Sequence, residues 1–300
     1  MSLRIAHFSD IHLTARPLRL RKRDWFGKRS TGWLNARVGR GKHFLDASTI
    51  AGVLAREIKA SGCNHVVFSG DATTLGMSSE FDEVRRVLTP DEGWPPRIAV
   101  PGNHDYYTHG AVRGGEFERV FANWQQGERV DSHTYPFAQK VGPLWLVAVN
   151  SAQANLFVWD SRGRVGRQQM NRLETLLKSL PPGPRVMVTH YPLCLADGQN
   201  EIRWRRLRDA HKLRDLCQVL NVKLWLHGHR HVGYFCPVDR ALPFPVVCVG
   251  SATQARKWSY NEYTFVDDKM HGRRRVWSPE AGSFVDGDAF TLPFALDQEK

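Results

Sequence analysis

Apolar and polar positions alternate along the chain in patterns that predict short strands separated by amphipathic helices. Strand patterns occupy residues 4–9, 65–69, 98–100, 144–149, 185–189, 222–226, 246–249 and 263–266. Helical spacing of apolar residues predicts helices from Asp46 to Gly62, from Ser78 or Ser79 onward, over 170–180 and over 207–220. This alternation predicts an α/β fold. In such folds, ligands bind beyond the carboxyl ends of the strands.

No internal repeat or linker divides these elements, so we expect a single domain over residues 1–285. Residues 286–300 carry little pattern and are expected to form a loosely held C-terminal tail. No apolar run reaches the ~20 residues that span a membrane, and the N-terminus lacks the apolar stretch of a secretory signal. The five cysteines are scattered and odd in number, which favours a cytoplasmic protein over a disulfide framework.

Composition changes this picture in one place only. The 300 residues carry a net charge of +12, and residues 16–43 hold ten basic side chains against one acidic side chain, Asp24. This segment therefore supplies nine of the twelve net positive charges, and it interleaves them with Trp25, Phe26 and Trp33. The charge is a local feature that requires a local explanation.

Polar clusters follow five of the predicted strands, and together they supply carboxylates, imidazoles and one amide oxygen. In chain order the clusters are Asp10-Ile11-His12, Gly70-Asp71, Gly102-Asn103-His104-Asp105, His190 and Gly228-His229-Arg230-His231. Oxygen and imidazole ligands without cysteine suit Mn²⁺, Fe or Zn²⁺. Seven candidate ligands are too many for one tetrahedral ion, but two ions that share a bridging carboxylate would use them all. A lone histidine is more often structural, whereas five ordered clusters predict a site.

The ordered clusters closely resemble the motifs of calcineurin-like metallophosphoesterases, from residue 4 to about residue 265. The resemblance implies a four-layer sandwich of two mixed β-sheets flanked by helices. It also implies an assignment of the ligands, in which Asp71 bridges two divalent metal ions. Asp10, His12 and His231 would hold one metal, and Asn103, His190 and His229 would hold the other. Mn²⁺ is the favoured metal, with Fe or Zn²⁺ as alternatives.

These roles predict a metal-dependent phosphoric ester hydrolase. Two cations ~3.5–4 Å apart would bind phosphate oxygens and generate a bridging hydroxide that attacks phosphorus. His104 would lie beside the metals without binding them and would protonate the leaving oxygen. The substrate would be a phosphodiester, a phosphomonoester or a pyrophosphate.

The second cluster departs from the pattern of many relatives, which continue Gly-Asp-x-x-Asp and often add an Arg. This chain has Thr74 and Leu75 at those two positions. In the relatives, that Asp orients the catalytic His and that Arg grips phosphate. The departure disfavours the Ser/Thr protein phosphatase branch, and it leaves Asp105 or a backbone carbonyl as the group that orients His104. We therefore take His104 and Asp105 as the candidate catalytic residues.

The basic, aromatic insertion at 16–43 follows a predicted ligand loop, so we expect it near the mouth of the site. A second basic cluster, Arg203-Trp204-Arg205-Arg206, follows His190 and is expected to flank the same mouth. The mixture suits an anionic membrane surface, which we favour, or nucleic acid, or an ordinary solvated loop. A cytoplasmic protein that is peripheral on the inner face of the membrane would fit the first alternative.

The insertion also bears on the substrate. Trp25 to Arg29 and Gly32 to Asn35 resemble a bacterial calcineurin-like subgroup that includes UDP-diacylglucosamine hydrolases of lipid A synthesis. The resemblance implies a lipid-linked phosphoester, with UDP-2,3-diacylglucosamine as one alternative. A cyclic-nucleotide phosphodiesterase or a nuclease is the alternative favoured by the positive charge. A non-catalytic interaction protein on the same fold is disfavoured, because all seven ligands remain.

Overall fold

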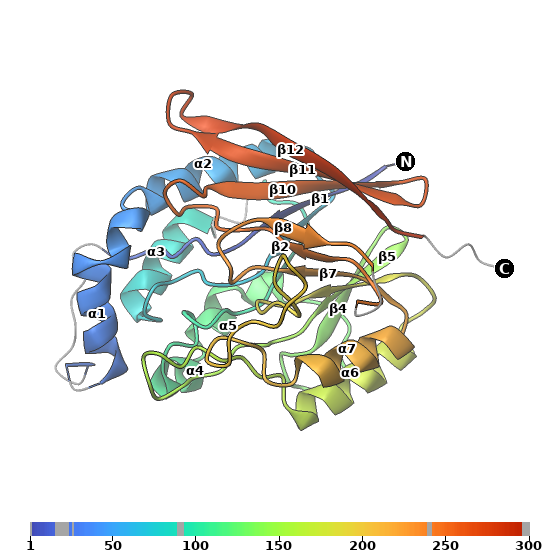
Figure 1. Cartoon of the computed structure of the whole chain (residues 1–300), viewed down its shortest axis with the longest axis horizontal. Helices are drawn as coiled ribbons and strands as arrows, with labels where there is room; N and C mark the ends of the chain where they lie inside the picture. Colours follow the sequence, from blue (N-terminus) through green and yellow to red (C-terminus); the bar gives the residue numbers. More distant parts are fainter. Residues whose placement is uncertain (1, 16–23, 26, 89–92, 239–241, 296–300) are drawn as a thin grey trace.

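The structure, a computed structural model, describes residues 2–15, 24–25, 27–88, 93–238 and 242–295. Its strands form two six-stranded sheets, and helices lie outside both of them (Figure 1). The α/β fold expected from the sequence is therefore confirmed. No helix in the described part of the chain is both long enough and apolar enough to cross a membrane.

The first sheet has the strand order β12-β11-β10-β1-β2-β3. Its strands are β1 (Leu3–Phe8), β2 (His65–Phe68), β3 (Arg97–Ala99), β10 (Ser259–Val266), β11 (Lys269–Ser278) and β12 (Ser283–Pro293). β1, β2 and β3 are parallel to one another, whereas β10, β11 and β12 add antiparallel neighbours on one side. The carboxyl ends of β1, β2 and β3 therefore lie at the same edge.

The second sheet has the order β4-β5-β6-β7-β9-β8. Its strands are β4 (Phe137–Val141), β5 (Leu144–Ala148), β6 (Arg185–Val188), β7 (Val222–His227), β8 (Tyr234–Cys236) and β9 (Val246–Cys248). The four central strands are parallel, and β4 and β8 are antiparallel edge strands. Both sheets thus have a parallel centre, and loops that follow parallel strands can meet at one edge of the molecule.

The helices cover the outer faces of the sheets. They are α1 (Lys28–Val38), α2 (Ala47–Ala60), α3 (Ser78–Leu88), α4 (His109–Gly114), α5 (Glu116–Val120), α6 (Arg167–Ser179) and α7 (Ala210–Val219), with short 3₁₀ turns η2 (Arg40–Phe44) and η3 (Ala122–Trp124). Figure 1 shows α6 and α7 together at the lower right and α1 at the far left. α2 illustrates the amphipathic pattern, because Ile50, Leu54 and Ile58 are buried at helical spacing.

Side chains of β1 alternate between two cores. Leu3 and Ile5 join the core between the sheets, whereas Ala6 and Phe8 face the core that includes α2. This alternation follows from the two-residue period of a strand. The layers are therefore helix, sheet, sheet and helix, and the four-layer arrangement implied by the sequence resemblance is confirmed.

The predicted strands correspond to β1, β2, β3, β5, β6, β7, β9 and β10, and the predicted helices to α2, α3, α6 and α7. The sequence patterns missed β4, β8, β11, β12, α1, α4 and α5. The prediction of a loose tail from residue 286 was wrong for the described part, because residues 286–293 are the second half of β12 and pair with β11. β12 lies at the sheet edge and buries mainly Phe284 and Leu292, so its polar middle hid the pattern.

The insertion at 16–43 contains regular structure that its sequence did not predict. α1 and the start of η2 lie within it, while residues 16–23 are outside the described residues. α1 buries only Gly32, so it lacks the apolar stripe from which helices are usually recognised. It is attached by Arg29, which donates hydrogen bonds to the carbonyls of Leu75 and Gly76, and by Trp33, which packs against Leu75, Met77 and Tyr107.

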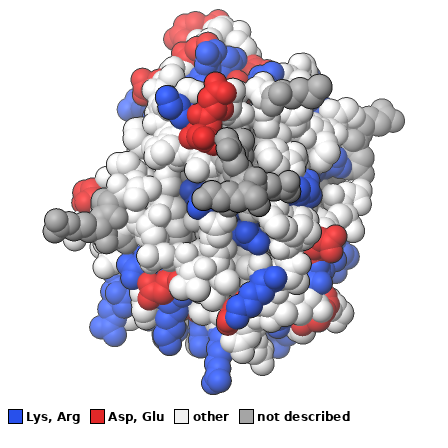
Figure 2. All heavy atoms as spheres, turned by 90° about the vertical axis from the view of Figure 1, so that its right-hand side faces the viewer, with Lys and Arg blue, Asp and Glu red and all other residues white. Residues whose placement is uncertain are grey.

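The positive charge is not spread evenly over the surface. On the face turned toward the viewer in Figure 2, Lys and Arg side chains gather along the lower edge with acidic side chains among them, and both signs mix at the top. Charges of opposite sign at such distances partly cancel. This face therefore presents a mixed surface, unlike the loops around the cavity described below.

Candidate metal centre and its cavity

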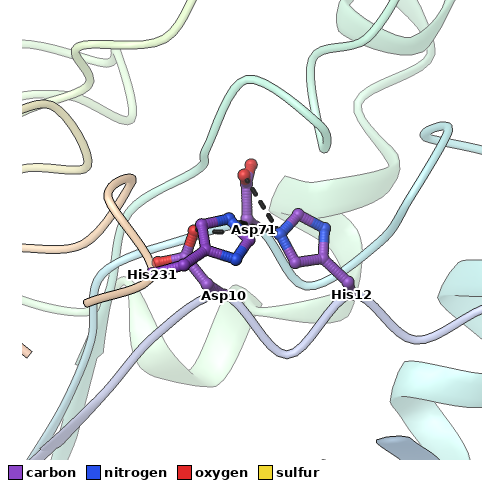
Figure 3. A group of neighbouring side chains, drawn as sticks. All are labelled: Asp10, His12, Asp71 and His231. Carbon is purple, nitrogen blue, oxygen red and sulfur yellow. Dashed lines mark hydrogen bonds and ion pairs between the residues drawn. The ribbon is translucent and has the colours of Figure 1, made fainter. Parts of the chain in front are cut away.

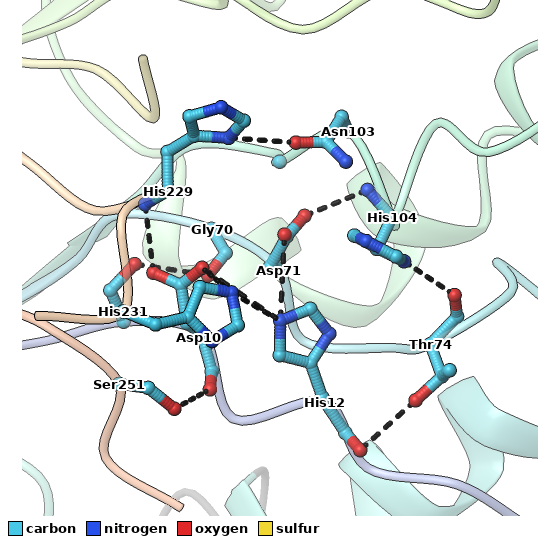
Figure 4. Close-up of polar contacts among 12 residues, drawn as sticks. Asp10, His12, Gly70, Asp71, Thr74, Asn103, His104, His229, His231 and Ser251 are labelled. Carbon is cyan, nitrogen blue, oxygen red and sulfur yellow. Dashed lines mark hydrogen bonds and ion pairs between the residues drawn. The ribbon is translucent and has the colours of Figure 1, made fainter. Parts of the chain in front are cut away.

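All seven candidate ligands converge at the carboxyl ends of the parallel strands. Figure 4 labels all of them except His190. β1 leads into Asp10 and His12, and β2 leads into Asp71. From the second sheet, His190 follows β6, and His229 and His231 follow β7. The remaining ligand, Asn103, follows β3. The two sheets thus contribute facing halves of one pocket.

The first half of the pocket contains Asp10, His12, Asp71 and His231 (Figure 3). One potential ligand atom from each residue lies within 4.8 Å of the others. His231 Nε2 is 3.1 Å from Asp10 Oδ1 and 3.2 Å from His12 Nε2. All four residues are buried.

The second half is formed by Asn103, His190 and His229 around the same Asp71. Asn103 Oδ1 is 3.2 Å from His190 Nε2 and 3.0 Å from His229 Nδ1. Asp71 Oδ2 lies 3.4 Å from His190 Nε2 and 3.6 Å from His12 Nε2, one in each half. Asp71 is therefore the carboxylate that lies between the two halves.

Hydrogen bonds on the outer sides of the imidazole rings fix which nitrogen faces the pocket. Nδ1 of His12 contacts the Thr73 carbonyl at 3.1 Å, and Nδ1 of His190 contacts the Ser69 carbonyl at 2.8 Å. Nδ1 of His231 contacts Oε1 of Gln254. Because a carbonyl oxygen only accepts, each Nδ1 carries a proton, and each Nε2 is the nitrogen that faces the pocket. Nε2 atoms that converge in this way would offer their lone pairs to a shared cation.

The buried carboxylates also indicate that the pocket binds positive charge. Burial alone would raise the pKa of Asp10, but His231 and the hydrogen bonds with His12 and His231 hold it well below its usual value. Burial alone would also raise the pKa of Asp71. The nearby His190 and His104 outweigh it, so the pKa of Asp71 lies below its usual value. Asp10 Oδ1 is buried, and His231 Nε2 lies 3.1 Å from it. Two ionised carboxylates in a buried pocket fit divalent cations.

The histidines of the second half differ in charge. Burial lowers the pKa of His190, but the neighbouring Asp71 carboxylate outweighs it and raises the value to about 9. Burial and the nearby His190 lower the pKa of His229 well below its usual value. His229 is thus held in the neutral form that binds metals. His190 compensates the charge of Asp71 with a proton, which a cation can replace.

Backbone conformation sets these ligands apart from the rest of the chain. Nine described residues other than glycine have positive φ, and five of them are candidate ligands: Asp10, His12, Asp71, His229 and His231. The left-handed region costs an L-residue roughly 1–2 kcal/mol and persists only where surrounding contacts enforce it. Contacts in the folded protein therefore hold these loops in unfavourable backbone conformations that direct the ligand side chains into the pocket.

Two positions next to the ligands require glycine because a carboxylate lies very close to the backbone there. A Cβ atom on Gly102 would lie 2.1 Å from Asp71 Oδ1, and one on Gly228 would lie 2.5 Å from Asp10 Oδ2. Neither glycine has positive φ, whereas Gly70 has φ of 98°. The sequence explanation of permissive turns thus holds for Gly70, and space for the carboxylates explains the other two.

His104 lies at the edge of the pocket, next to His12, with ring centroids 4.7 Å apart. Its backbone N–H donates to Asp71 Oδ1 at 2.7 Å, and its Nδ1 lies 2.6 Å from the Thr74 carbonyl oxygen. Of the two groups proposed to orient His104, the backbone carbonyl makes this contact (Figure 4). Position 74 thus supplies through its main chain what an Asp side chain supplies in the related motif.

Asp105 is buried beneath this arrangement. Its carboxylate accepts hydrogen bonds from the backbone N–H groups of Asp71, Thr73 and Gly102. Burial, together with the charge of Asp71, raises its pKa to about 7. Asp105 therefore ties the loop after β2 to the loop after β3, and it does not line the cavity at the site.

A cavity of about 500 Å³ opens over the candidate ligands. Its floor includes Asp71, Asn103, His104, His229 and His231. Its walls carry four basic side chains (Lys28, Arg205, Arg230 and Lys257) and two apolar ones (Val158 and Trp159), and Arg230 is paired with Glu201. Burial lowers the pKa of Lys28 to about 8, partly opposed by the charge of Asp160. The insertion and the second basic cluster thus flank the mouth, as expected.

Sequence patterns missed several residues of this site. Gln254 and Lys257 follow β9, and Ser251 donates to the Asp10 carbonyl at 2.7 Å. The rule that ligands gather beyond parallel strands could have indicated this segment, because β9 is parallel to β7. Val158 and Trp159 gave no comparable signal, since they follow no strand directly.

A comparison with protein families gives one match over most of the chain. The family model of the calcineurin-like phosphoesterases (Metallophos) matches residues 3–233. None of the curated proteins compared with the chain is similar enough in sequence to count as a match.

Several solved structures share the fold at low sequence identity. Purple acid phosphatase PPD1 from yellow lupin (Lupinus luteus) seeds has a TM-score of 0.61 at 15% identity, over 98% of this chain and 54% of that one. The chain thus spans about half the length of the lupin protein. A dimetal phosphatase from Danio rerio has a TM-score of 0.61 at 12% identity, over 98% and 99%. GAP50, the anchor in the inner membrane complex of Plasmodium, has 0.57 at 13%, over 100% and 90%.

Proposed function

The chain belongs to the calcineurin-like phosphoesterase family and is a metal-dependent phosphoester hydrolase, and from this premise we propose that its substrate joins a phosphoester or pyrophosphate to a lipid-like group. The observation that carries the proposal is the composition of the cavity wall. Basic Lys28, Arg205 and Lys257 stand beside apolar Val158 and Trp159 above the candidate metal ligands. A phosphate-bearing molecule with an apolar arm complements both kinds of wall.

We assign one cation to Asp10, His12 and His231 and a second to Asn103, His190 and His229, with Asp71 shared. Mn²⁺ is our preferred metal, with Fe or Zn²⁺ as alternatives, because the ligands are oxygen and imidazole nitrogen without thiolate. Divalent cations bound there would polarise the phosphoryl group and lower the pKa of a bound water.

The protein's own residues position the substrate and move a proton. Because Nδ1 of His104 contacts the Thr74 carbonyl, the proton given to the leaving oxygen comes from Nε2. Asp105 acts as a positioning residue through the backbone of Asp71 and Gly102. Arg205 and Lys257 neutralise phosphate oxygens that lie away from the scissile bond.

A substrate panel tests this proposal. With Mn²⁺, we expect hydrolysis of bis(p-nitrophenyl) phosphate, and we expect kcat/KM for an acylated UDP-glucosamine to exceed that for its non-acylated counterpart by about tenfold or more. Trp159→Ser should reduce the acylated substrate's advantage, whereas Arg205→Ser should weaken both substrates. Equal rates with and without acyl chains would contradict the lipid-linked substrate and leave the reaction class intact.

UDP-2,3-diacylglucosamine pyrophosphohydrolysis is the most specific form of this proposal. A cyclic-nucleotide phosphodiesterase or a nuclease is the second candidate, favoured by the net charge of +12. Metal-dependent cleavage of cyclic nucleotides or single-stranded DNA that is faster than cleavage of acylated substrates would favour this second candidate over a lipid-linked substrate.

We also propose that the insertion at 16–43 contacts an anionic membrane. In its described part, Trp25, Leu34 and Val38 are exposed apolar residues next to basic ones. Leu34→Ser and Val38→Ser test this role better than a deletion of 19–37, because a deletion would also remove the Arg29 contacts to the loop after β2. An affinity of both variants for anionic vesicles equal to that of the wild type would reject the membrane contact of the insertion.

A further inference from the structure

The loop between β5 and α6 exposes four consecutive apolar residues. Leu156, Phe157, Val158 and Trp159 are 73%, 53%, 43% and 61% exposed. Ile202 and Trp204, in the loop before α7, are 60% and 44% exposed. Single exposed apolar residues are common, but contiguous groups of this kind usually mark a surface that binds something. We call residues 156–159 and 202–206 together the apolar-basic rim.

Hydrogen bonds and ring contacts hold the rim in shape. The backbone N–H of Ser161 donates to the Trp204 carbonyl at 2.9 Å, which joins its two loops. The Phe157 and Trp159 rings stack with centroids 4.8 Å apart. The guanidinium of Arg162 lies 4.7 Å from the Trp204 ring centre. The rim is thus a preformed surface, so docking would require little further ordering of side chains.

The charge that accompanies this apolar surface is positive. Arg203, Arg205 and Arg206 are exposed, and no ion pair engages them among the described residues. The nearby acidic groups are turned inward, since Asp160 is buried and paired with Arg162, and Glu201 is buried and paired with Arg230. The rim therefore combines exposed rings and aliphatic chains with uncompensated arginines, in contrast to the mixed charges in Figure 2.

We propose that the apolar-basic rim docks on an anionic lipid bilayer. Aromatic and aliphatic side chains at headgroup depth, flanked by arginines that meet anionic headgroups, form the pattern of an interfacial membrane contact. Val158, Trp159 and Arg205 also line the cavity, so docking turns its mouth toward the membrane. The proposal concerns binding and does not depend on which phosphoester is hydrolysed.

The chemistry of the rim favours a lipid bilayer over nucleic acid or a second copy of the chain as its binding partner. Nucleic acid would use the arginines and the aromatic rings, but it has no use for exposed Leu156 and Ile202, because aliphatic chains do not stack on bases. A second copy of the chain would meet three arginines with three arginines across a two-fold axis. An acyl interior bounded by anionic headgroups accepts all of these side chains.

Vesicle binding of the full chain tests the proposal. Wild-type protein should co-sediment with phosphatidylglycerol-containing vesicles and bind pure phosphatidylcholine vesicles about tenfold or more weakly. The triple variant Leu156→Ser/Phe157→Ser/Ile202→Ser should lose about tenfold or more in affinity for the anionic vesicles. Arg203→Ser/Arg206→Ser should also weaken binding and reduce its dependence on salt.

Matched controls separate docking from misfolding. Val219→Ser in α7 and Val285→Ser in β12 remove apolar side chains that are exposed away from the rim, and they should bind vesicles like the wild type. Leu156, Phe157 and Ile202 do not line the cavity, so the triple variant should keep its thermal midpoint and its rate on bis(p-nitrophenyl) phosphate. The proposal is overturned if wild type ignores anionic vesicles, if the triple variant binds equally, or if single-stranded DNA alone shows the variant-dependent binding.

Discussion

In the floor of the site (the seven candidate ligands and His104), Asp10, Asp71 and His190 are buried and surrounded by partners, whereas in the apolar-basic rim Leu156 and Trp159 face solvent. Five floor residues adopt left-handed backbone conformations, and Gly102 and Gly228 lie where any side chain would collide with a carboxylate. The rim is held mainly by backbone hydrogen bonds and ring stacking, so its side chains are free to differ.

The contrast separates two functions within one site, namely the chemistry at the floor and the binding at the rim. The floor must aim several donors at the same points, so almost any change there disturbs the chemistry. The rim selects what approaches the floor through surface charge and apolar area, where individual changes alter affinity by modest factors. Floor variants should therefore change kcat steeply, and rim variants should change binding.

Asp71→Asn should have the largest effect. The substitution removes the negative charge shared by both halves of the pocket, so kcat/KM for bis(p-nitrophenyl) phosphate should fall roughly a thousandfold or more. Trp159→Ser, at the rim of the same cavity, should stay within about tenfold of wild type on this small substrate. Comparable losses in the two variants, measured with saturating Mn²⁺, would erase the distinction between floor and rim.

His104→Gln should lower kcat by about 10²- to 10⁴-fold for substrates with poor leaving groups. The loss should shrink with p-nitrophenolate, which needs little protonation. Thr74→Ala is the matched control, because it keeps the carbonyl that contacts Nδ1 and should retain activity within a few-fold. A loss independent of the leaving group would argue against proton donation by His104, and a large loss in Thr74→Ala would assign the orienting role to its side chain.

Glu80 is buried and hydrogen-bonds to the loop after β2, and its protonation should make the stability of the protein depend on pH. It accepts the backbone N–H groups of Leu75 and Met77, and burial raises its pKa from 4.5 to about 7. Between these values the folded state keeps a proton that the unfolded state has released, so stability falls as pH rises from 4.5 to 7.

The unfolding free energy of wild type relative to Glu80→Gln should therefore decrease by on the order of 3 kcal/mol between pH 4.5 and 8. Denaturant unfolding at several pH values measures this difference. A difference that stays constant, or that grows with pH, would show that Glu80 is ionised in the folded protein throughout.

Gly102→Ala should lower both the stability of the protein and its rate. Its new Cβ would press against Asp71, which should cost about 1–3 kcal/mol and lower kcat through displacement of that carboxylate. In Gly52→Ala in α2 the new Cβ would make only an ordinary contact, 3.7 Å from Arg56 Nη1, so the variant should stabilise the protein by about 0.5–1 kcal/mol. Equal thermal midpoints for both variants would contradict the close approach at Gly102.

Sequence patterns predicted the floor better than the rim for a physical reason. Metal chemistry restricts residue types, and parallel strands fix where those residues meet, so Asp10, Asp71 and His229 could be identified from type and position. The left-handed backbone at these residues could not, because it results from contacts between distant loops. The sequence analysis offered a backbone carbonyl as one group that could orient His104, but it could not assign that carbonyl to Thr74, since a backbone carbonyl carries no residue identity.

Two of the missed elements, α1 and β12, bury little apolar surface in a regular pattern, whereas β4 and α5 bury apolar side chains but are only five residues long. α1 buries only Gly32, and β12 alternates weakly at the sheet edge. The run Leu156 to Trp159 has the opposite character, because an apolar tetrapeptide in a sequence usually indicates a buried segment. Its exposure follows from the loop geometry between β5 and α6 and becomes visible only in three dimensions.

The central claim is that side chains from both sheets hold two cations around Asp71. Anomalous diffraction from crystals grown with Mn²⁺ tests it most directly, because it locates the ions without reference to activity. We expect two peaks roughly 3.5–4 Å apart, one beside Asp10, His12 and His231 and the other beside Asn103, His190 and His229, with Asp71 contacting both. A single peak, or peaks away from Asp71 under saturating metal, would contradict the account.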